Sequence, residues 1–162
     1  MQNTLAANAG SAHSPDVVPE VLTVALPRQA GACYDLFCDI ERVPEWMSIV
    51  RSAAVTTRDR HGRPRDVAFL ARLRGATIGY SLSYRYRSMD RWLGWSTPGT
   101  SSMTILGCAQ FTPLGEKSCL MTYSLFLDLA SGGVPSWGDP QFDNHAASTA
   151  MIDYRDFVMR TL

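Results

Sequence analysis

The sequence predicts an α+β domain in which a seven-stranded antiparallel sheet curves around a long C-terminal helix, with two short helices after the first strand. Three features predict it. The stretch from Ala32 to Met47 carries apolar residues at helical spacing and then a proline. From Ile49 onward, apolar residues recur at every second position in segments that short polar turns separate. Near the C-terminus the spacing becomes helical again, which supplies a cover for the apolar face of the sheet.

The composition bounds the size of the domain and the class of partner. A chain of 162 residues fits one domain that can bury a core without disulfide bonds or metal ions. Its hydrophobic content of 46% and charged content of 19% are typical of globular proteins. The 15 basic and 15 acidic side chains cancel at pH 7, which speaks against a general nucleic-acid binder. We therefore expect an uncharged small molecule as the partner.

No sequence signal indicates a metal, a cofactor or a membrane segment. Residues 1–17 are small and polar, which predicts a mobile tail before a single domain over residues 18–162. The tail lacks the pattern of a signal peptide and no apolar run is long enough to span a membrane, so we expect a cytoplasmic protein. Monomer and homodimer remain open. Four cysteines show neither a CxxC pair nor zinc-site spacing, and we expect buried thiols at Cys33, Cys38, Cys108 and Cys119.

The first strand and the first helix follow from local preferences. Val18 to Leu26 is rich in β-branched residues and ends before Pro27, which is a plausible first residue of a helix. In that helix, Tyr34, Phe37 and Cys38 lie on one face because they are spaced by three and four positions. This face needs a sheet to cover it.

A proline separates the two short helices. Pro44 disfavours helical geometry at Val43, so we expect a separate short turn at Glu45 to Met47. That turn carries the large indole of Trp46 and a thioether, side chains that close a hollow or a core.

Six further strands complete the sheet. Their expected bounds are Ile49 to Arg58, Asp66 to Arg74, the segment from Gly75 to Arg87, Trp92 to Thr97, Met103 to Thr112 and Ser118 to Leu129. Alternation places Arg72 and Arg74 on the face opposite to Val67, Phe69, Ala71 and Leu73. After Gly75, the same alternation gathers Ile78, Tyr80, Leu82, Tyr84 and Tyr86 on one face. We expect turns at Pro98–Gly99 and at Pro113–Gly115. The C-terminal helix is expected to begin with Pro140 in its first helical position and to continue through the segment from Gln141 to Arg160.

A resemblance supports this fold. The stretch YDLFCDIERVPEWMSIVRSAAV, followed by HGRP, the aromatic strand around Tyr84, the FTPLG turn, the strand TYSLFLDL and a final helix, resembles the START-related helix-grip (SRPBCC) superfamily. The likeness is strongest to the polyketide cyclase/dehydrase and coenzyme Q-binding branch and covers roughly Val18 to Leu162. It implies a ligand cavity between the sheet and the long helix.

The residues that face one another also favour a cavity. Small side chains, including Ala146, Ala147 and Ala150, lie near the middle of the last helix, opposite aromatic residues of the strands. Ligand pockets are mostly apolar with a few polar groups, which tyrosine hydroxyls and an indole N–H would provide. An ordinary aromatic core, with the alanines permitting close packing, is the alternative. The expected ligand-binding residues are Trp46, Phe69, Tyr80, Leu82, Tyr84, Trp95, Tyr123, Ala150, Met151 and Tyr154.

Three functions are compatible with the sequence. The first is binding or carrying of a small hydrophobic ligand such as a lipid, a polyketide or a quinone. The second is a polyketide aromatase/cyclase or dehydrase; the resemblance implies an inward arginine on an early strand, whereas Arg72 and Arg74 are expected to point outward unless the register slips by one residue. The third is an interaction domain with a closed cavity and an apolar patch around Trp92 or Trp137.

The remaining expectations concern the carboxylates and the entrance. Asp153 lies near the apolar stripe of the last helix and is the candidate for a buried acid. Asp39, Glu41 and Glu45 are expected to be capping or solvated groups. We expect a ligand to enter between the turns at 41–47 and 98–101 and the loop at 130–138.

Overall fold

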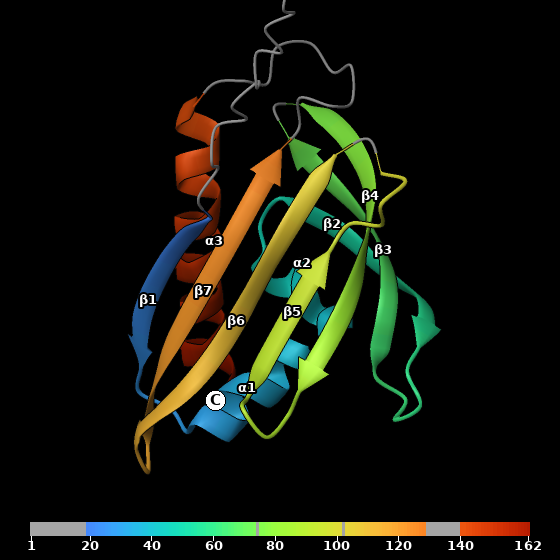
Figure 1. Ribbon diagram of the computed structural model, residues 1–162. Helices are drawn as coiled ribbons and strands as arrows, with labels where there is room; N and C mark the ends of the chain where they lie inside the picture. Colours follow the sequence, from blue (N-terminus) through green and yellow to red (C-terminus); the bar gives the residue numbers. More distant parts are fainter. Residues whose placement is uncertain (1–18, 74, 102, 129–139) are drawn as a thin grey trace, which may run out of the picture.

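The computed structural model describes residues 19–73, 75–101, 103–128 and 140–162, and the side chains of all of these except residues 73 and 140–145. Helices and strands follow in the order that Figure 1 colours from blue to red. The elements are β1 (Glu20–Leu26), α1 (Ala30–Cys38), a 3₁₀ turn η1 (Ile40–Arg42), α2 (Val43–Trp46), β2 (Val50–Arg58), β3 (Pro64–Leu73), β4 (Ala76–Arg87), β5 (Trp92–Ser96), β6 (Thr104–Gly115), β7 (Ser118–Asp128) and α3 (Pro140–Thr161).

The seven strands form one antiparallel sheet with the order β1-β7-β6-β5-β4-β3-β2. Only β1 leaves the order of the chain, because it pairs with β7 across the whole length from Glu20 to Leu26. The helices cover one face of the curved sheet: α3 contacts β1 and β7, and α1 contacts β6 and β7 (Figure 1). The predicted architecture is therefore confirmed.

The segment between β1 and β2 differs from the prediction at two prolines. Pro27 lies in a bend, and α1 begins three residues later at Ala30, so Pro27 is not a helical residue. Val43 is helical despite the proline that follows it, with φ −51° and ψ −40°. Its amide already donates to the carbonyl of Ile40 in the preceding 3₁₀ turn, and this bond holds Val43 in helical geometry. The second turn therefore starts two residues earlier than expected.

The alternation along β3 and β4 is as predicted. Val67, Phe69 and Ala71 are at most 3% exposed, while Arg72 is exposed on the other face. Arg74 lies outside the described residues. At the far end of the sheet, β6 continues through Pro113 to Gly115, and the turn to β7 is formed by residues 116–117 instead of 113–115. The strand tolerates Pro113 because the pairing with β7 becomes irregular there.

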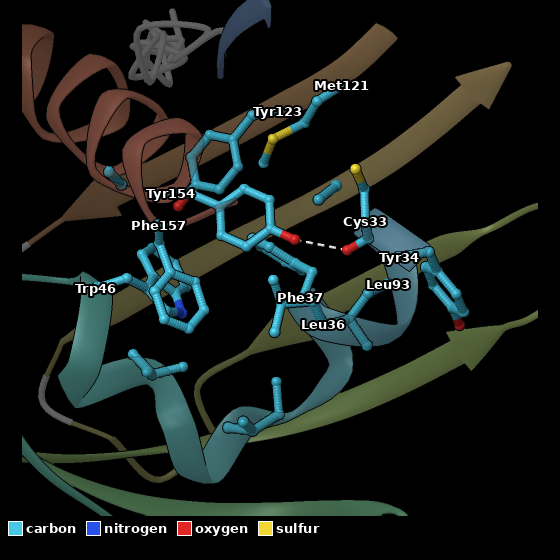
Figure 2. Packing of buried hydrophobic residues seen from close by; sticks show 14 of the residues in the cluster. Cys33, Tyr34, Leu36, Phe37, Trp46, Leu93, Met121, Tyr123, Tyr154 and Phe157 are labelled. Atoms are coloured by element: carbon cyan, nitrogen blue, oxygen red, sulfur yellow. Dashed lines mark hydrogen bonds between the residues drawn. The ribbon is translucent and has the colours of Figure 1, made fainter. Parts of the chain in front are cut away.

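An aromatic cluster fills one end of the space between the helices and the sheet. The Tyr154 ring lies edge-on to Phe37, with ring centroids 4.8 Å apart, and edge-on to Trp46 at 5.2 Å. Phe111 of β6 and Phe157 of α3 complete this cluster. Figure 2 shows the Tyr154 hydroxyl directed at the carbonyl oxygen of Cys33, to which it donates a hydrogen bond of 2.5 Å. The cluster joins α1, α2 and α3 into one packed unit.

The described part of the chain contains no helix with the length and apolar character needed to cross a lipid bilayer.

Candidate functional site

Beyond the aromatic cluster, the space between the sheet and α3 contains a cavity of about 440 Å³. Phe37 and Trp46 line the cavity as well as belonging to the cluster, so the cluster forms one of its walls. The sheet contributes the largest share of the lining, mostly apolar and aromatic side chains. These are Phe69, Ala71, Ile78, Tyr80, Leu82, Tyr84, Trp95, Ile105, Tyr123, Leu125 and Leu127, and Met103 lines the cavity from just before β6.

The cavity exists because side chains on α3 are short where the sheet is concave. Ala146, Thr149 and Ala150 of α3 line the space, and their side chains are short. A second feature widens it from the side of the sheet. The ring of Trp95 lies across its strand partner Gly107, where a Cβ atom would come within 2.6 Å of the ring. The absence of a side chain at Gly107 therefore sets the position of one wall.

Eight of the ten predicted ligand-binding residues line the cavity. They come from α2, the sheet and α3, and comprise Trp46, Phe69, Tyr80, Leu82, Tyr84, Trp95, Tyr123 and Ala150. Met151 and Tyr154 do not line it. Tyr154 is fully buried in the aromatic cluster, and its hydroxyl donates a hydrogen bond to the carbonyl oxygen of Cys33. The structure therefore places Tyr154 in the packing between α1 and α3 and outside the lining of the cavity.

Three tyrosine hydroxyls at the cavity have no hydrogen-bond partner among the described residues: those of Tyr80, Tyr84 and Tyr123. Neighbouring rings hold two of these side chains in place. The Tyr80 ring stacks on that of Phe69 with centroids 5.3 Å apart, and the Tyr123 ring packs on that of Trp95 with centroids 5.4 Å apart. Burial raises the pKa of Tyr80 to about 12 and raises the pKa values of Tyr84 and Tyr123 as well. All three are therefore neutral near pH 7 and able to donate a hydrogen bond to a bound molecule.

One carboxylate lines the cavity among the described residues. Asp153 on α3 is partly buried, and its Oδ2 accepts hydrogen bonds from the backbone N–H and the hydroxyl of Ser48, at 3.2 and 3.1 Å. Ser48 is exposed, so the pair lies at the edge of the cavity toward solvent. No arginine, lysine or histidine lines the cavity in the described ranges, and Arg72 points to the opposite face of the sheet.

The other candidate groups have different roles. Glu45 pairs with Arg42 at 2.7 Å, and Glu41 pairs with Arg58 at 3.1 Å, so both are surface ion pairs. Cys33 and Cys119 are buried free thiols, and burial raises the pKa of Cys33 to about 12, which keeps this thiol protonated and unreactive. Within the described ranges, no group of three His, Cys, Asp or Glu side chains is placed to hold a metal ion.

Sequence reasoning missed several lining residues. The strand alternation that placed the aromatic residues could also have identified four inward-facing aliphatic residues, which are Ile78, Ile105, Leu125 and Leu127. From the segment between Phe37 and Ile49 only Trp46 was predicted; the other lining residues of this segment depend on how the short helices pack beside α3.

The entrance proposed from the sequence is described only in part. Its loop at 130–138 lies outside the described residues, as does Trp137, one of the two tryptophans considered for an apolar patch. The other, Trp92, is half-buried and stacks against the guanidinium of Arg87 at 4.2 Å, so it forms no free apolar surface.

Comparison with known proteins identifies the fold. No family model and no curated protein matches the sequence. Among solved structures, a START superfamily protein from Mycobacterium smegmatis is similar, with a TM-score of 0.74, 15% identity and coverage of 89% of this chain and 99% of that one. The Zhui aromatase/cyclase from a Streptomyces species gives a TM-score of 0.70 with 10% identity, covering 88% of this chain and 94% of that one.

The di-domain aromatase/cyclase StfQ from the steffimycin biosynthetic pathway is also similar. It gives a TM-score of 0.68 with 14% identity, covering 87% of this chain and 45% of the longer protein. At these identities the likeness concerns the fold, which is the START-related helix-grip fold predicted from the sequence.

Proposed function

We propose that this chain, which has the START-related helix-grip fold, binds or carries a small, mainly apolar molecule in the cavity beneath α3. The observation that carries the proposal is the cavity of about 440 Å³ with its mostly apolar lining. Cavities of roughly 300 to 1,000 Å³ are typical of small-molecule sites. An apolar ligand in a space of this size would gain packing contacts with the lining side chains.

The unpartnered hydroxyls indicate which polar groups the molecule carries. Tyr80, Tyr84 and Tyr123 offer neutral donors, so carbonyl or hydroxyl oxygens of a ligand would satisfy them. An apolar body would pack on side chains such as Phe69, Leu82 and Ala150. A lipid, a polyketide or a quinone combines both features, and all three belong to the proposed ligand class.

A filled cavity tests the proposal. Ala150→Trp places an indole in the space, whereas Ile152→Trp adds the same side chain at an exposed position of the same helix, where Ile152 is 54% exposed. We expect the native protein and Ile152→Trp to take up a fluorescent hydrophobic probe with similar affinity, and Ala150→Trp to lose uptake while its circular dichroism stays native. Equal uptake by the two variants would overturn the site.

The cyclase alternative has less support. Two of the three similar structures described above are aromatase/cyclases, but only the fold is shared at these identities. Developing enolate charge in the described cavity would have to be stabilised by neutral tyrosines with raised pKa values, which are weaker donors than a cation. We therefore favour binding over catalysis.

A further inference from the structure

The chain as a whole has no net charge, but one carboxylate lies at the edge of the cavity. Among the described residues that line the cavity, Asp153 is the one Asp, Glu, Lys, Arg or His. Two nearby carboxylates of the η1–α2 segment are each neutralised by an arginine, Glu45 by Arg42 and Glu41 by Arg58. No ion pair joins Asp153 to a cationic side chain in the described ranges. The edge of the cavity therefore has an uncompensated negative charge.

The geometry of this carboxylate leaves one oxygen for another partner. Both hydrogen bonds from Ser48 go to Oδ2, one from the backbone N–H and one from the hydroxyl. They fix the orientation of the side chain, and none of the hydrogen bonds within the described ranges goes to Oδ1. A fixed carboxylate beside an apolar space strongly favours a cation and disfavours an anion, because the low polarity of the wall weakens screening.

The rings around the cavity suit the same kind of group. Trp46, Phe37 and Tyr84 line the space, and the faces of aromatic rings attract cations. Ser48 is exposed, so a charged group at Asp153 remains in contact with water while an apolar chain enters the cavity. This arrangement avoids the cost of burying the charge completely.

We propose that the cavity takes a cationic amphiphile, a molecule with an apolar body and a protonated amine that pairs with Asp153 at the edge of the cavity. This inference rests on the proposed function and adds the charge of the ligand to it. Asp153 is thus a specificity-determining residue, which accepts an amine and rejects a carboxylate of the same length.

Three probes with the same apolar chain test this: dodecylamine, dodecanol and dodecanoate, each competing with a fluorescent probe near pH 7. We expect the native protein to bind the amine at least about tenfold more tightly than the carboxylate, as a charge-assisted hydrogen bond provides. Added salt should weaken the binding of dodecylamine and leave the affinity for dodecanol unchanged. Asp153→Asn keeps an acceptor for Ser48 and removes the charge, so it should bring the three affinities close together.

The matched control is Asp156→Asn, which removes the same charge from an exposed position on the same helix. It should leave the preference for the amine intact. If the alcohol binds but the amine binds no better than the carboxylate, or if Asp156→Asn abolishes the preference as fully as Asp153→Asn, the charge inference fails and the apolar site stands. If none of the probes displaces the fluorescent one, the binding proposal itself fails.

Discussion

Tyr154 of α3 donates a hydrogen bond of 2.5 Å to the carbonyl oxygen of Cys33 in α1, and this bond connects the two helices that cover the sheet. Both residues are fully buried. The bond lies inside the aromatic cluster that closes one end of the cavity, so the Tyr154 hydroxyl joins two helices and does not line the cavity.

The first prediction concerns this bond. Tyr154→Phe keeps the ring contacts with Phe37 and Trp46 and removes the hydroxyl. We expect the free energy of unfolding to fall by about 1 kcal/mol, the typical net value of a buried hydrogen bond. Urea unfolding measures this loss, and probe affinity should stay unchanged.

Tyr123→Phe is the matched comparison, because its hydroxyl has no partner in the described structure. It should leave the free energy of unfolding within about 0.5 kcal/mol of the native value and weaken binding of an oxygen-containing ligand. If Tyr154→Phe weakened ligand binding and left the free energy of unfolding unchanged, the assignment of Tyr154 to the cluster would be wrong.

A second prediction concerns alkaline pH. Burial raises the pKa of Tyr80 to about 12, against about 10 for the unfolded chain, and raises those of Tyr84 and Tyr123 in the same direction. Between about pH 10 and 12 the unfolded state releases protons that the folded state keeps, so stability falls as pH rises, by roughly 1.4 kcal/mol per pH unit for each such tyrosine. Below about pH 10 these groups have no effect.

Denaturant unfolding at several alkaline pH values, together with tyrosinate absorbance, measures this loss. The absorbance should show one group of tyrosines ionising only as the protein unfolds. A free energy of unfolding that stays constant from about pH 9 to 12 would contradict the neutral, water-excluded state of the cavity tyrosines.

A third prediction concerns the glycine beneath Trp95. Gly107→Ala would bring a methyl group within 2.6 Å of the Trp95 ring and of the carbonyl oxygen of Ser124. Either the ring or the strand must move, and overpacking of this kind costs about 1 to 3 kcal/mol. We expect lower stability by urea unfolding and weaker probe uptake, since a displaced Trp95 would occupy part of the cavity.

Gly79→Ala is the control for the loss of glycine within a strand. A Cβ at Gly79 would meet the side chain of Leu70 at 3.5 Å, which is ordinary van der Waals contact. It should therefore change neither stability nor uptake substantially. Similar effects of the two substitutions would show that the glycine itself matters more than the packing of Trp95.

The sequence predicted the sheet and most of the cavity wall because alternation determines the face of a strand. Phe69, Tyr80 and Tyr84 follow directly from this rule. It could not predict the role of Tyr154. Helical spacing places Tyr154 on the inner face of α3 together with Ala150, but it does not tell how far along the helix the cavity ends.

Local rules also failed where neighbouring elements determine the geometry. The rule for a residue before proline predicts extended geometry at Val43, yet the preceding 3₁₀ turn holds it helical. The α1–α2 segment adds Ile40, Val43 and Met47 to the cavity wall for the same reason, since their positions depend on packing that has no short-range signal.

Gly107 controls the size of the cavity without lining it. Its strand partner Trp95 lines the cavity, whereas Gly107 itself does not. A methyl group gained at position 107 would therefore alter the size of the cavity while every lining residue stays the same. Inferring the size of the cavity from the lining residues alone would overlook such a change.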